Sequence, residues 1–475
     1  MSKNTKKHIL TFGGALMYGL MIFGVQMIIG MLNSYQSQFY TSVFGADLTI
    51  CAVIILAAKV ISSFSDPIIG SVIDKSHFKG GKMRPFVAIS ILPFCILTML
   101  MFINISFPNN ALMYLYIAVT SVLWNITMSF ADIPSQGLLA LLSPDAEERS
   151  LAATISNIMK SVGIAAPTVI VPVVCILTKS AVITAKEYLI TSAFVCVIAI
   201  VLVGLSVKTS REVIESPPQE SSFKAMFSEL KNNKMLLFTF LVYILGFGRN
   251  MAMNIQVQAG AVLMHEISLD IGSFHLELAG ENLGVLLGVG SGIMSAVSLI
   301  IAPIIHNKLG TRKTYFIFGI YGIVVNAVCY ILYTVVGGVF RSVPALIIMT
   351  GLAAFMFGTH GFTPMIMLSD TVDYTEMTTG KRNEGVQYAV FSLSVKLANA
   401  FSVAVGVFVV GLSGYVGTMT SADITPAMQN IVLAAFWLIP GICAFLSCIP
   451  VYFFKIDGEV KQQVQEFMAA KELKE

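Results

Sequence analysis

Residues 47–73 read DLTICAVIILAAKVISSFSDPIIGSVI, an apolar run that is long enough to cross a lipid bilayer. A membrane-spanning helix needs about 20 apolar residues. This run nevertheless contains Lys59 and Asp66, and Asp132 and Asp370 also lie in or beside apolar runs. An unpaired charge in hydrocarbon costs roughly 3 kcal/mol or more, so charged residues within spans usually face a wet interior. These four residues therefore predict an internal pathway for a polar solute.

The composition is that of a polytopic membrane protein. Of the 475 residues, 56% are hydrophobic and 12% are charged, and the mean hydropathy is +0.82. A typical water-soluble domain has about twice that share of charged residues. The net charge of +3 is too small to predict a nucleic-acid partner. We expect a multi-pass protein of the cell membrane that has the lipid bilayer as its surroundings and functions as a monomer.

The cysteines and histidines do not predict a chemical site. The seven cysteines fall singly inside apolar segments, which is typical of packed side chains rather than disulfides or metal ligands. The six histidines form no His-x-x-x-His pair, and no Gly-x-Ser-x-Gly motif occurs. We therefore expect a protein that is not an enzyme and that has no metal site and no cofactor.

Twelve apolar segments are candidate membrane spans. They centre on residues 10–36, 47–73, 85–106, 111–142, 151–178, 186–207, 234–264, 283–305, 314–335, 343–369, 384–417 and 425–454. The first is too long to be the core of a cleavable signal peptide, so we expect it to stay as an anchor. Most of the 29 basic residues fall on one side of this topology, and only Lys179, Lys186 and Arg341 fall on the other. Because loops on the cytoplasmic side are enriched in lysine and arginine, both termini are predicted to be cytoplasmic.

The longest break between spans runs from Lys208 to Lys234 and divides the chain into six helices plus six. The predicted fold class is an all-α membrane protein with twelve transmembrane helices in two pseudo-symmetric six-helix bundles. The predicted domains are an N-terminal bundle, a cytoplasmic linker, a C-terminal bundle and a cytoplasmic tail, at residues 1–207, 208–233, 234–454 and 455–475.

Two segments outside the spans each have two interpretations. Residues 223–230 in the linker could form an interfacial amphipathic helix or a plain connector. The acidic break from His265 to Asn282 could be a lid, although a solvated loop is the simpler expectation.

A short repeat supports the division into two bundles. Residues 74–85 read DKSHFKGGKMRP after the second span, and residues 306–313 read HNKLGTRK after the eighth. Each loop has a glycine followed by basic residues. Basic inner loops are common, but their equivalent places favour two bundles related by pseudo-symmetry, as in carriers that work by alternating access.

Several motifs together carry a resemblance to a known family. They are SDPIIG at 65–70, GKMRPF at 81–86, Trp124 followed by DIP at 132–134, DTVDYTE at 370–376, and TGKRNEG at 379–385 leading to Lys396. In combination they closely resemble the glycoside-pentoside-hexuronide:cation symporter family of the major facilitator superfamily, whose best-known member is melibiose permease. The resemblance covers essentially the whole chain. It implies the major facilitator fold and cation-coupled import of a carbohydrate.

The resemblance implies a cation site at Asp66 and Asp132. Melibiose permease has a further aspartate one turn before Asp66, where this chain has Ser62. Sodium prefers about six hard oxygen ligands, and the hydroxyls of Ser62, Ser65 and Ser129 could supply some of them. A proton needs only one carboxylate in a suitable environment. The smaller number of carboxylates favours H+ as the coupling ion and leaves Na+ possible.

Lys59 has two interpretations. It lies three residues before Ser62, so it extends the face that Ser62 and Asp66 share on one helix. It could act as the counter-ion of Asp66 during the return of the empty carrier, or it could contact the substrate directly. We favour the counter-ion.

The resemblance also implies a sugar site. Its residues here are Gln26, Trp124, Asp132, Gln136, Asn157, Lys160 and Lys396. Gln26 stands where the family has an acid, Gln136 where it has an aromatic residue, and Asn157 where it has an arginine. Amides and carboxylates bind sugar hydroxyls, and an indole can pack on a pyranose ring. The site therefore remains suited to a carbohydrate, although melibiose is not expected.

The substrate could be anionic, because the lysines remain while one acid is replaced by Gln26. Arg249 and His360 could add to the positive charge. The simpler expectation is that Arg249 extends outward to the interface and that His360 caps a bend beside Gly358 and Gly361.

The resemblance further implies an inner gate, in which acids near residue 370 pair with inner-loop arginines when the carrier faces outward. Its members are Arg84, Arg149, Asp370, Asp373 and Glu376. A solvated cytoplasmic turn is the alternative for this acidic segment. At the level of function, the alternative is a lipid or amphiphile carrier of the same superfamily.

Overall fold

The computed structural model describes residues 10–76, 78, 81–143, 146–180, 183–210, 212–213, 223–264, 267–271, 274–278, 283–380 and 383–472. The chain forms two compact units. Unit 1 comprises Met1–Ala46 and Phe64–Glu220, and unit 2 comprises Asp47–Ser63 and Ser221–Glu475. The boundary between the units falls inside one helix, α2 (Leu48–Lys75).

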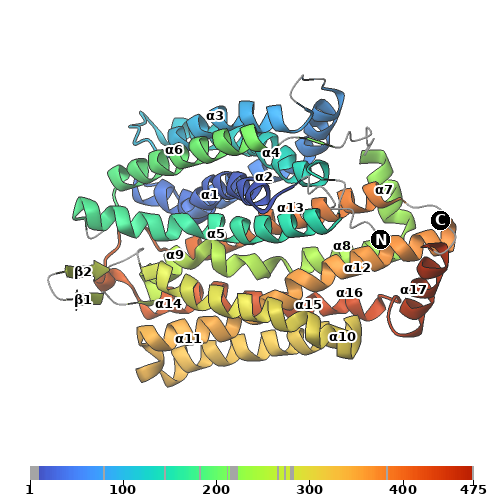
Figure 1. Cartoon of the computed structure of the whole chain (residues 1–475). Helices are drawn as coiled ribbons and strands as arrows, with labels where there is room; N and C mark the ends of the chain where they lie inside the picture. Colours follow the sequence, from blue (N-terminus) through green and yellow to red (C-terminus); the bar gives the residue numbers. More distant parts are fainter. Residues whose placement is uncertain are drawn as a thin grey trace. The chain divides into compact units, whose positions relative to one another are not determined.

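Unit 1 is built from long apolar helices. They are α1 (Phe12–Ser42), the second half of α2, α3 (Arg84–Met101), α4 (Asn110–Gly137) with a 3-10 turn (Leu138–Leu141), α5 (Ala146–Thr178) and α6 (Ala185–Thr209). Helix α1 packs along α5 and α6, and α3 packs against α4 and α6 (Figure 1). Because α1 is surrounded by other helices, 21 of its 31 residues are buried.

Unit 2 contains the remaining elements, several of which are interrupted helices. In chain order they are α7 (Phe223–Asn232), α8 (Lys234–Leu245), a 3-10 turn (Phe247–Asn250), α9 (Met251–Leu263), β1 (Ile267–Ile271), β2 (Phe274–Leu278), α10 (Gly284–Ile331), a π turn (Leu332–Val336), a 3-10 turn (Gly338–Arg341), α11 (Val343–Ala354), α12 (Met356–Thr379), α13 (Glu384–Leu412), a 3-10 turn (Ser421–Asp423), α14 (Pro426–Leu433), a π turn (Ala434–Leu438), α15 (Ile439–Leu446), α16 (Cys448–Phe453) and α17 (Glu459–Glu472).

Twelve membrane crossings follow from the described helices. Eleven helical stretches are long and apolar enough to span a bilayer, and the longest, Gly284–Val336, has 53 residues. At about 1.5 Å per residue it would be more than twice as long as the hydrocarbon is thick. Gly310 interrupts this stretch with φ 78° and ψ 174°, a backbone conformation that residues with a side chain rarely adopt. The stretch is therefore two spans, and the predicted break at residues 306–313 is confirmed.

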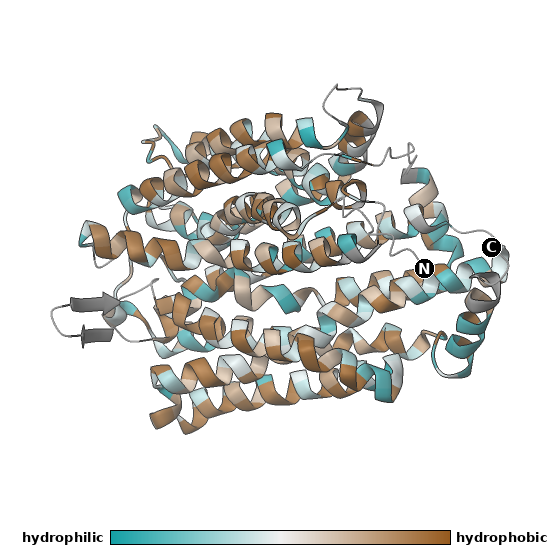
Figure 2. Cartoon of the chain, viewed as in Figure 1, coloured by the Kyte–Doolittle hydropathy of each residue, from teal (hydrophilic) through white to brown (hydrophobic). Residues whose placement is uncertain are grey.

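The membrane-spanning helices are predominantly apolar, with polar residues interspersed along them (Figure 2). Large apolar side chains such as Leu177 and Ile300 are 77% and 70% exposed, whereas Gln38, Ser121 and Thr239 are fully buried. Polar groups within the hydrocarbon need partners from neighbouring helices, so they face the interior. Helix α17 is mostly hydrophilic, in contrast to the spans (Figure 2).

The loop between α2 and α3 is held by an acid that follows α6. The Glu212 carboxylate accepts backbone N–H groups of Lys82, Met83 and Arg84 at 2.7, 2.8 and 2.8 Å. These donors belong to the start of α3, where N–H groups lack helical acceptors. The Arg84 side chain donates in turn to the carbonyl of Val207 near the end of α6.

The corresponding loop of unit 2 has the same arrangement. The backbone N–H of Arg312 donates to Asp457 at 3.2 Å, and the Arg312 guanidinium donates to the carbonyl of Phe454 through Nε at 2.7 Å. A Cβ on Gly310 would lie 2.8 Å from the Asp457 carboxylate. In both units a basic residue after a glycine binds the end of a later helix, and an acid beyond that end binds the loop. The repeat read from residues 74–85 and 306–313 thus has a structural counterpart.

The two segments outside the spans that each had two interpretations contain regular secondary structure. Residues 223–230 belong to helix α7, whose Met226 is buried against Leu236 and Leu368 of unit 2, so the segment is a docked helix. Within residues 265–282, β1 and β2 form an antiparallel hairpin in which Ile267 pairs with Leu278. A lid or a solvated loop was predicted for this segment, and strands were not.

Candidate functional site

Four of the predicted sugar residues in unit 1 form a continuous line of hydrogen bonds. Gln26 Nε2 on α1 donates to Asp132 Oδ1 on α4 at 2.6 Å. Gln136 Nε2 donates to Asp132 Oδ2 at 2.7 Å, and Lys160 Nζ on α5 donates to Gln136 Oε1 at 3.2 Å. We call Gln26, Asp132, Gln136 and Lys160 the polar ladder.

The ladder follows from local helix geometry. Asp132 and Gln136 are four residues apart on α4, so their side chains lie on one face. Helix α5, which carries Lys160, approaches α1 closely beside Gln26. A Cβ on Gly163 of α5 would lie 2.8 Å from the Phe23 carbonyl and 3.2 Å from Gln26 Cβ. Only glycine leaves room for this contact between α1 and α5.

The ladder runs from the interior of unit 1 to an accessible end. Gln26 is 2% exposed, Asp132 and Lys160 are half-buried, and Gln136 is exposed. Asp132 accepts a hydrogen bond on each carboxylate oxygen, while Gln136 retains a second amide N–H and Lys160 further N–H donors. Donors and acceptors therefore alternate over a short distance, which is the chemistry that binds polyhydroxylated ligands.

The remaining residues of the predicted cation site lie on α2 and α4. Asp66 and Ser65 are half-buried on α2, and Ser62 on the same helix is 4% exposed. Ser129 is fully buried one turn before Asp132 on α4, and its hydroxyl donates to the Asn125 carbonyl at 3.2 Å. Among the residues that the structure describes, no group of three or more His, Cys, Asp or Glu side chains is arranged to hold a metal ion.

Comparison with known proteins places the chain in a family. Residues 14–458 match the family described as MFS/sugar transport protein. The chain belongs to this family. It is therefore a membrane transporter rather than an enzyme, and the family prediction drawn from the sequence motifs is confirmed.

Relatives of this MFS/sugar transport protein include named sugar carriers. The isoprimeverose transporter of Lactiplantibacillus pentosus is 24% identical over 457 residues, which is 95% of this chain and 90% of that protein. The glucuronide carrier protein homolog of Escherichia coli (strain K12) is 22% identical over 439 residues, which is 90% of this chain and 89% of that protein.

Solved structures with the same fold are also transporters. The D-xylose-proton symporter matches with a TM-score of 0.59 and 15% identity, over 95% of this chain and 98% of that one. The nucleoside transporter NupG matches with a TM-score of 0.56 and 17% identity, over 93% of this chain and 99% of that one. At such low identity these likenesses show the fold, and the all-α major facilitator architecture predicted from the sequence is confirmed.

Two predicted sugar residues of the transporter lie apart from the ladder. The Trp124 ring is 2% exposed, packs on Phe94 with 5.1 Å between ring centroids, and donates through Nε1 to Thr98 Oγ1 at 2.8 Å. It has no exposed face for a sugar in this structure. Asn157 is exposed on α5, one turn before Lys160. In unit 2, Lys396 is half-buried on α13 and Lys59 is half-buried on α2.

The predicted gate residues have partners within their own units. The Arg84 guanidinium binds the end of α6, as described above, and Arg149 Nη1 donates to the Ser143 carbonyl at 2.8 Å. Asp370 forms an ion pair with Lys461 of α17 at 2.8 Å.

The remaining predicted gate acids, Asp373 and Glu376, follow Asp370 on α12. Asp373 is half-buried and Glu376 is 8% exposed. Lys461 was not predicted as a gate residue, because it lies 91 residues after Asp370 in a segment predicted to be a cytoplasmic tail.

Arg249 of the transporter does not extend outward as expected. It lies between α8 and α9, and its guanidinium donates to the His360 carbonyl at 2.8 Å and to the Tyr243 hydroxyl at 2.7 Å. The His360 ring is 3% exposed and its nitrogens face the carbonyls of Met356 and Ala444 at 2.9 and 3.3 Å. The sequence offered one signal, a glycine pair at Gly246 and Gly248 within a span.

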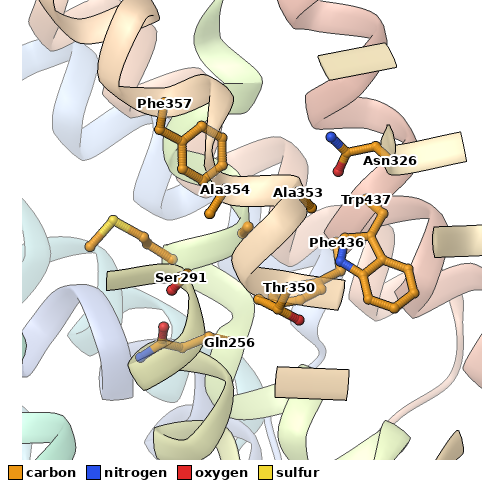
Figure 3. A pocket seen from close by; sticks show the side chains of 11 residues that line it. Gln256, Ser291, Asn326, Thr350, Ala353, Ala354, Phe357, Phe436 and Trp437 are labelled. Atoms are coloured by element: carbon orange, nitrogen blue, oxygen red, sulfur yellow. The ribbon is translucent and has the colours of Figure 1, made fainter. Parts of the chain in front are cut away.

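A small pocket in unit 2 is too small for a sugar (Figure 3). Its volume of about 10 Å³ holds roughly one water molecule. Polar side chains of Gln256, Ser291, Asn326 and Thr350 line it together with Trp437. Among the described residues, neither the Trp437 indole N–H nor the Thr350 hydroxyl has a hydrogen-bond partner.

Proposed function

We propose that this transporter imports a glycoside, pentoside or hexuronide together with a cation by alternating access. The polar ladder carries this proposal. It provides amide, carboxylate and ammonium groups in sequence at one place in unit 1, and such groups bind sugar hydroxyls. Further support comes from relatives that are named as carriers of isoprimeverose and glucuronides.

Coupling is assigned to Asp66 and Asp132, with Ser62, Ser65 and Ser129 as additional oxygen donors. H+ is the favoured ion, since few carboxylates are present for Na+, which remains the second candidate. Asp132 belongs both to this group and to the ladder, so occupancy of one site changes the acceptors available to the other. Cation and sugar then stabilise one another's bound state reciprocally.

The topology of the proposal places both termini in the cytoplasm, with bundles over 1–207 and 234–454. The basic inner loops support this orientation. Arg84, Arg149, Asp370, Asp373 and Glu376 are proposed as gate residues that exchange partners during the transport cycle. In that scheme Asp370 has two alternative partners, Lys461 and an inner-loop arginine.

A flux measurement in proteoliposomes tests the proposal. A panel of pentosides, glycosides and hexuronides is first screened by thermal stabilisation of the detergent-purified protein, with and without sodium. A sugar that stabilises the purified protein is then added to proteoliposomes that contain the protein. The external medium is expected to become more alkaline, because protons enter the vesicles with the sugar. Sugar uptake that is independent of both pH and sodium gradients would contradict coupling, and movement of lysolipid without sugar uptake would favour the lipid carrier.

A further inference from the structure

Arg249 lies at a break within a membrane-spanning stretch of unit 2. The span Lys234–Leu263 consists of α8, which ends at Leu245, and α9, which begins at Met251. Arg249 lies in the 3-10 turn between them, 15 residues after the start of the span. Interrupted helices near the middle of the membrane commonly supply ligand groups in transporters. The break therefore holds a cation at a depth where charge is costly.

The guanidinium is held in place by a carbonyl that a proline leaves without a partner. In a regular helix the His360 carbonyl would accept from the backbone N–H four residues later, but that residue is Pro364, which has no N–H. Arg249 Nη1 donates to this carbonyl at 2.8 Å. A carbonyl 111 residues later in the chain thus fixes this arginine side chain, which indicates a built position.

The partners of this guanidinium are all neutral. Besides the His360 carbonyl, Nη2 donates to the Tyr243 hydroxyl at 2.7 Å and Nε to Asn250 Oδ1 at 3.4 Å. The guanidinium carbon lies 4.4 Å from the centroid of the Tyr243 ring. Among the residues that the structure describes, no carboxylate pairs with Arg249. The charge of this half-buried cation within a span is therefore stabilised by an aromatic face and by dipoles but is not neutralised.

The geometry leaves donors for an incoming anion. A guanidinium has five N–H groups, and the three hydrogen bonds above use one on each nitrogen. One N–H remains on each of Nη1 and Nη2. Gly361 lies beside Nη1, because a Cβ there would be 3.9 Å from that nitrogen, and no side chain of residue 361 covers it.

We propose that Arg249 is a carboxylate-binding residue that makes the transporter selective for sugars bearing an acid group. This inference rests on the proposed function, since it names the charge class of the carried sugar. The planar guanidinium suits a carboxylate, which accepts two parallel N–H groups. Binding of the anion neutralises the charge within the span, and an uncharged sugar of the same shape lacks this gain.

The test compares two ligands of nearly the same shape, of which one carries a carboxylate and the other an uncharged amide. D-glucuronate and D-glucuronamide are titrated into the detergent-purified full-length protein, with thermal stabilisation and calorimetry as readouts. Wild type is expected to bind D-glucuronate more tightly by about 10- to 100-fold, the range for hydrogen bonds to a charged group. Arg249→Gln is expected to remove this difference while it leaves D-glucuronamide affinity nearly unchanged.

A matched control exists in the same unit. Arg341 also lies over a tyrosine ring, 5.4 Å from the Tyr333 centroid, and donates to the Tyr333 carbonyl at 3.1 Å, but it is exposed at the end of a 3-10 turn. Arg341→Gln is expected to keep the preference for D-glucuronate. Where Arg249→Gln folds poorly, Gly361→Leu serves as the second variant. It retains the arginine, covers Nη1, and is expected to weaken D-glucuronate binding selectively.

Three results would overturn the inference. The first is equal affinity of wild type for the two ligands, and the second is an equal loss of affinity for both ligands in Arg249→Gln. The third is that Arg249→Gln loses proton-coupled uptake of neutral sugars but keeps the preference for D-glucuronate. This third result would mean that Arg249 serves a carboxylate of the protein itself. Proton-coupled transport of neutral sugars by a wild type that does not prefer D-glucuronate would refute the anion site alone. Preference for D-glucuronate without any coupled flux would instead refute the proposed coupling.

Discussion

The Gln26 amide donates to the Asp132 carboxylate at 2.6 Å and links α1 to α4. A second bond joins the same two helices, from Gln36 Nε2 to Ser121 Oγ at 3.1 Å. The first involves an ionisable acceptor at the accessible ladder, whereas the second joins neutral groups that are 7% and 0% exposed. The two bonds therefore distinguish the proposed sugar-binding contact from a structural contact within one helix pair.

Asp132→Asn is expected to weaken sugar binding by about 10- to 100-fold. An asparagine keeps the size of the side chain, but its NH2 group replaces one of the two carboxylate oxygens and so sets a donor against the amide donor of Gln26 or Gln136. Hydrogen bonds to charged groups contribute roughly 1.5–3 kcal/mol. Calorimetry with the best sugar of the panel measures the change. Gln36→Leu is the control, and it should lower thermal stability while it leaves sugar affinity intact. Similar affinity losses in both variants would assign the ladder a structural role.

Asp66→Asn is expected to abolish uphill accumulation of sugar far more than sugar binding or exchange. The substitution removes the carboxylate proposed to carry the cation but preserves shape and hydrogen-bonding capacity on α2. Accumulation in energised vesicles and counterflow in de-energised vesicles measure the two activities separately. Unchanged accumulation would refute the coupling role of Asp66.

Glu212→Ala is expected to destabilise unit 1 by about 1–2 kcal/mol. The carboxylate accepts three N–H groups at the start of α3, and loss of a helix cap costs about this much. Thermal unfolding in detergent measures the effect. Asp457→Ala tests the equivalent acid of unit 2 and should give a smaller loss, because two backbone donors, those of Arg312 and Gly458, are affected instead of three. No change in either variant would mean that water replaces these acids fully.

Thr350→Val is expected to raise stability by about 1 kcal/mol. The Thr350 hydroxyl is buried and has no hydrogen-bond partner among the described residues, so an isosteric methyl group removes a desolvation penalty. Thr371→Val is the matched change on α12, where the hydroxyl is also buried but donates to the Met367 carbonyl at 2.6 Å. That variant should lose stability. A gain in both would show that the effect comes from valine and not from the missing partner.

Much of the fold could be predicted from single segments. The length and hydropathy of each run locate twelve crossings, and the glycine at 310 marks the break that separates the eighth from the ninth. The paired inner loops were also visible as a repeat. The acids that hold those loops, Glu212 and Asp457, were not, because they follow helices that lie more than a hundred residues later in the chain.

For the candidate site, the sequence by itself determined which residues are costly to place in a membrane and which of them share a helix face, as Asp132 and Gln136 do. Only the tertiary structure decided that Gln26 and Lys160 join them, that Trp124 turns toward Thr98, and that Arg249 binds the carbonyl freed by Pro364. The physical reason is that hydropathy and helical spacing describe the surroundings of one segment. The partner across a helix interface depends instead on the rotation and close approach of two helices, which small residues such as Gly163 permit and which no single segment records.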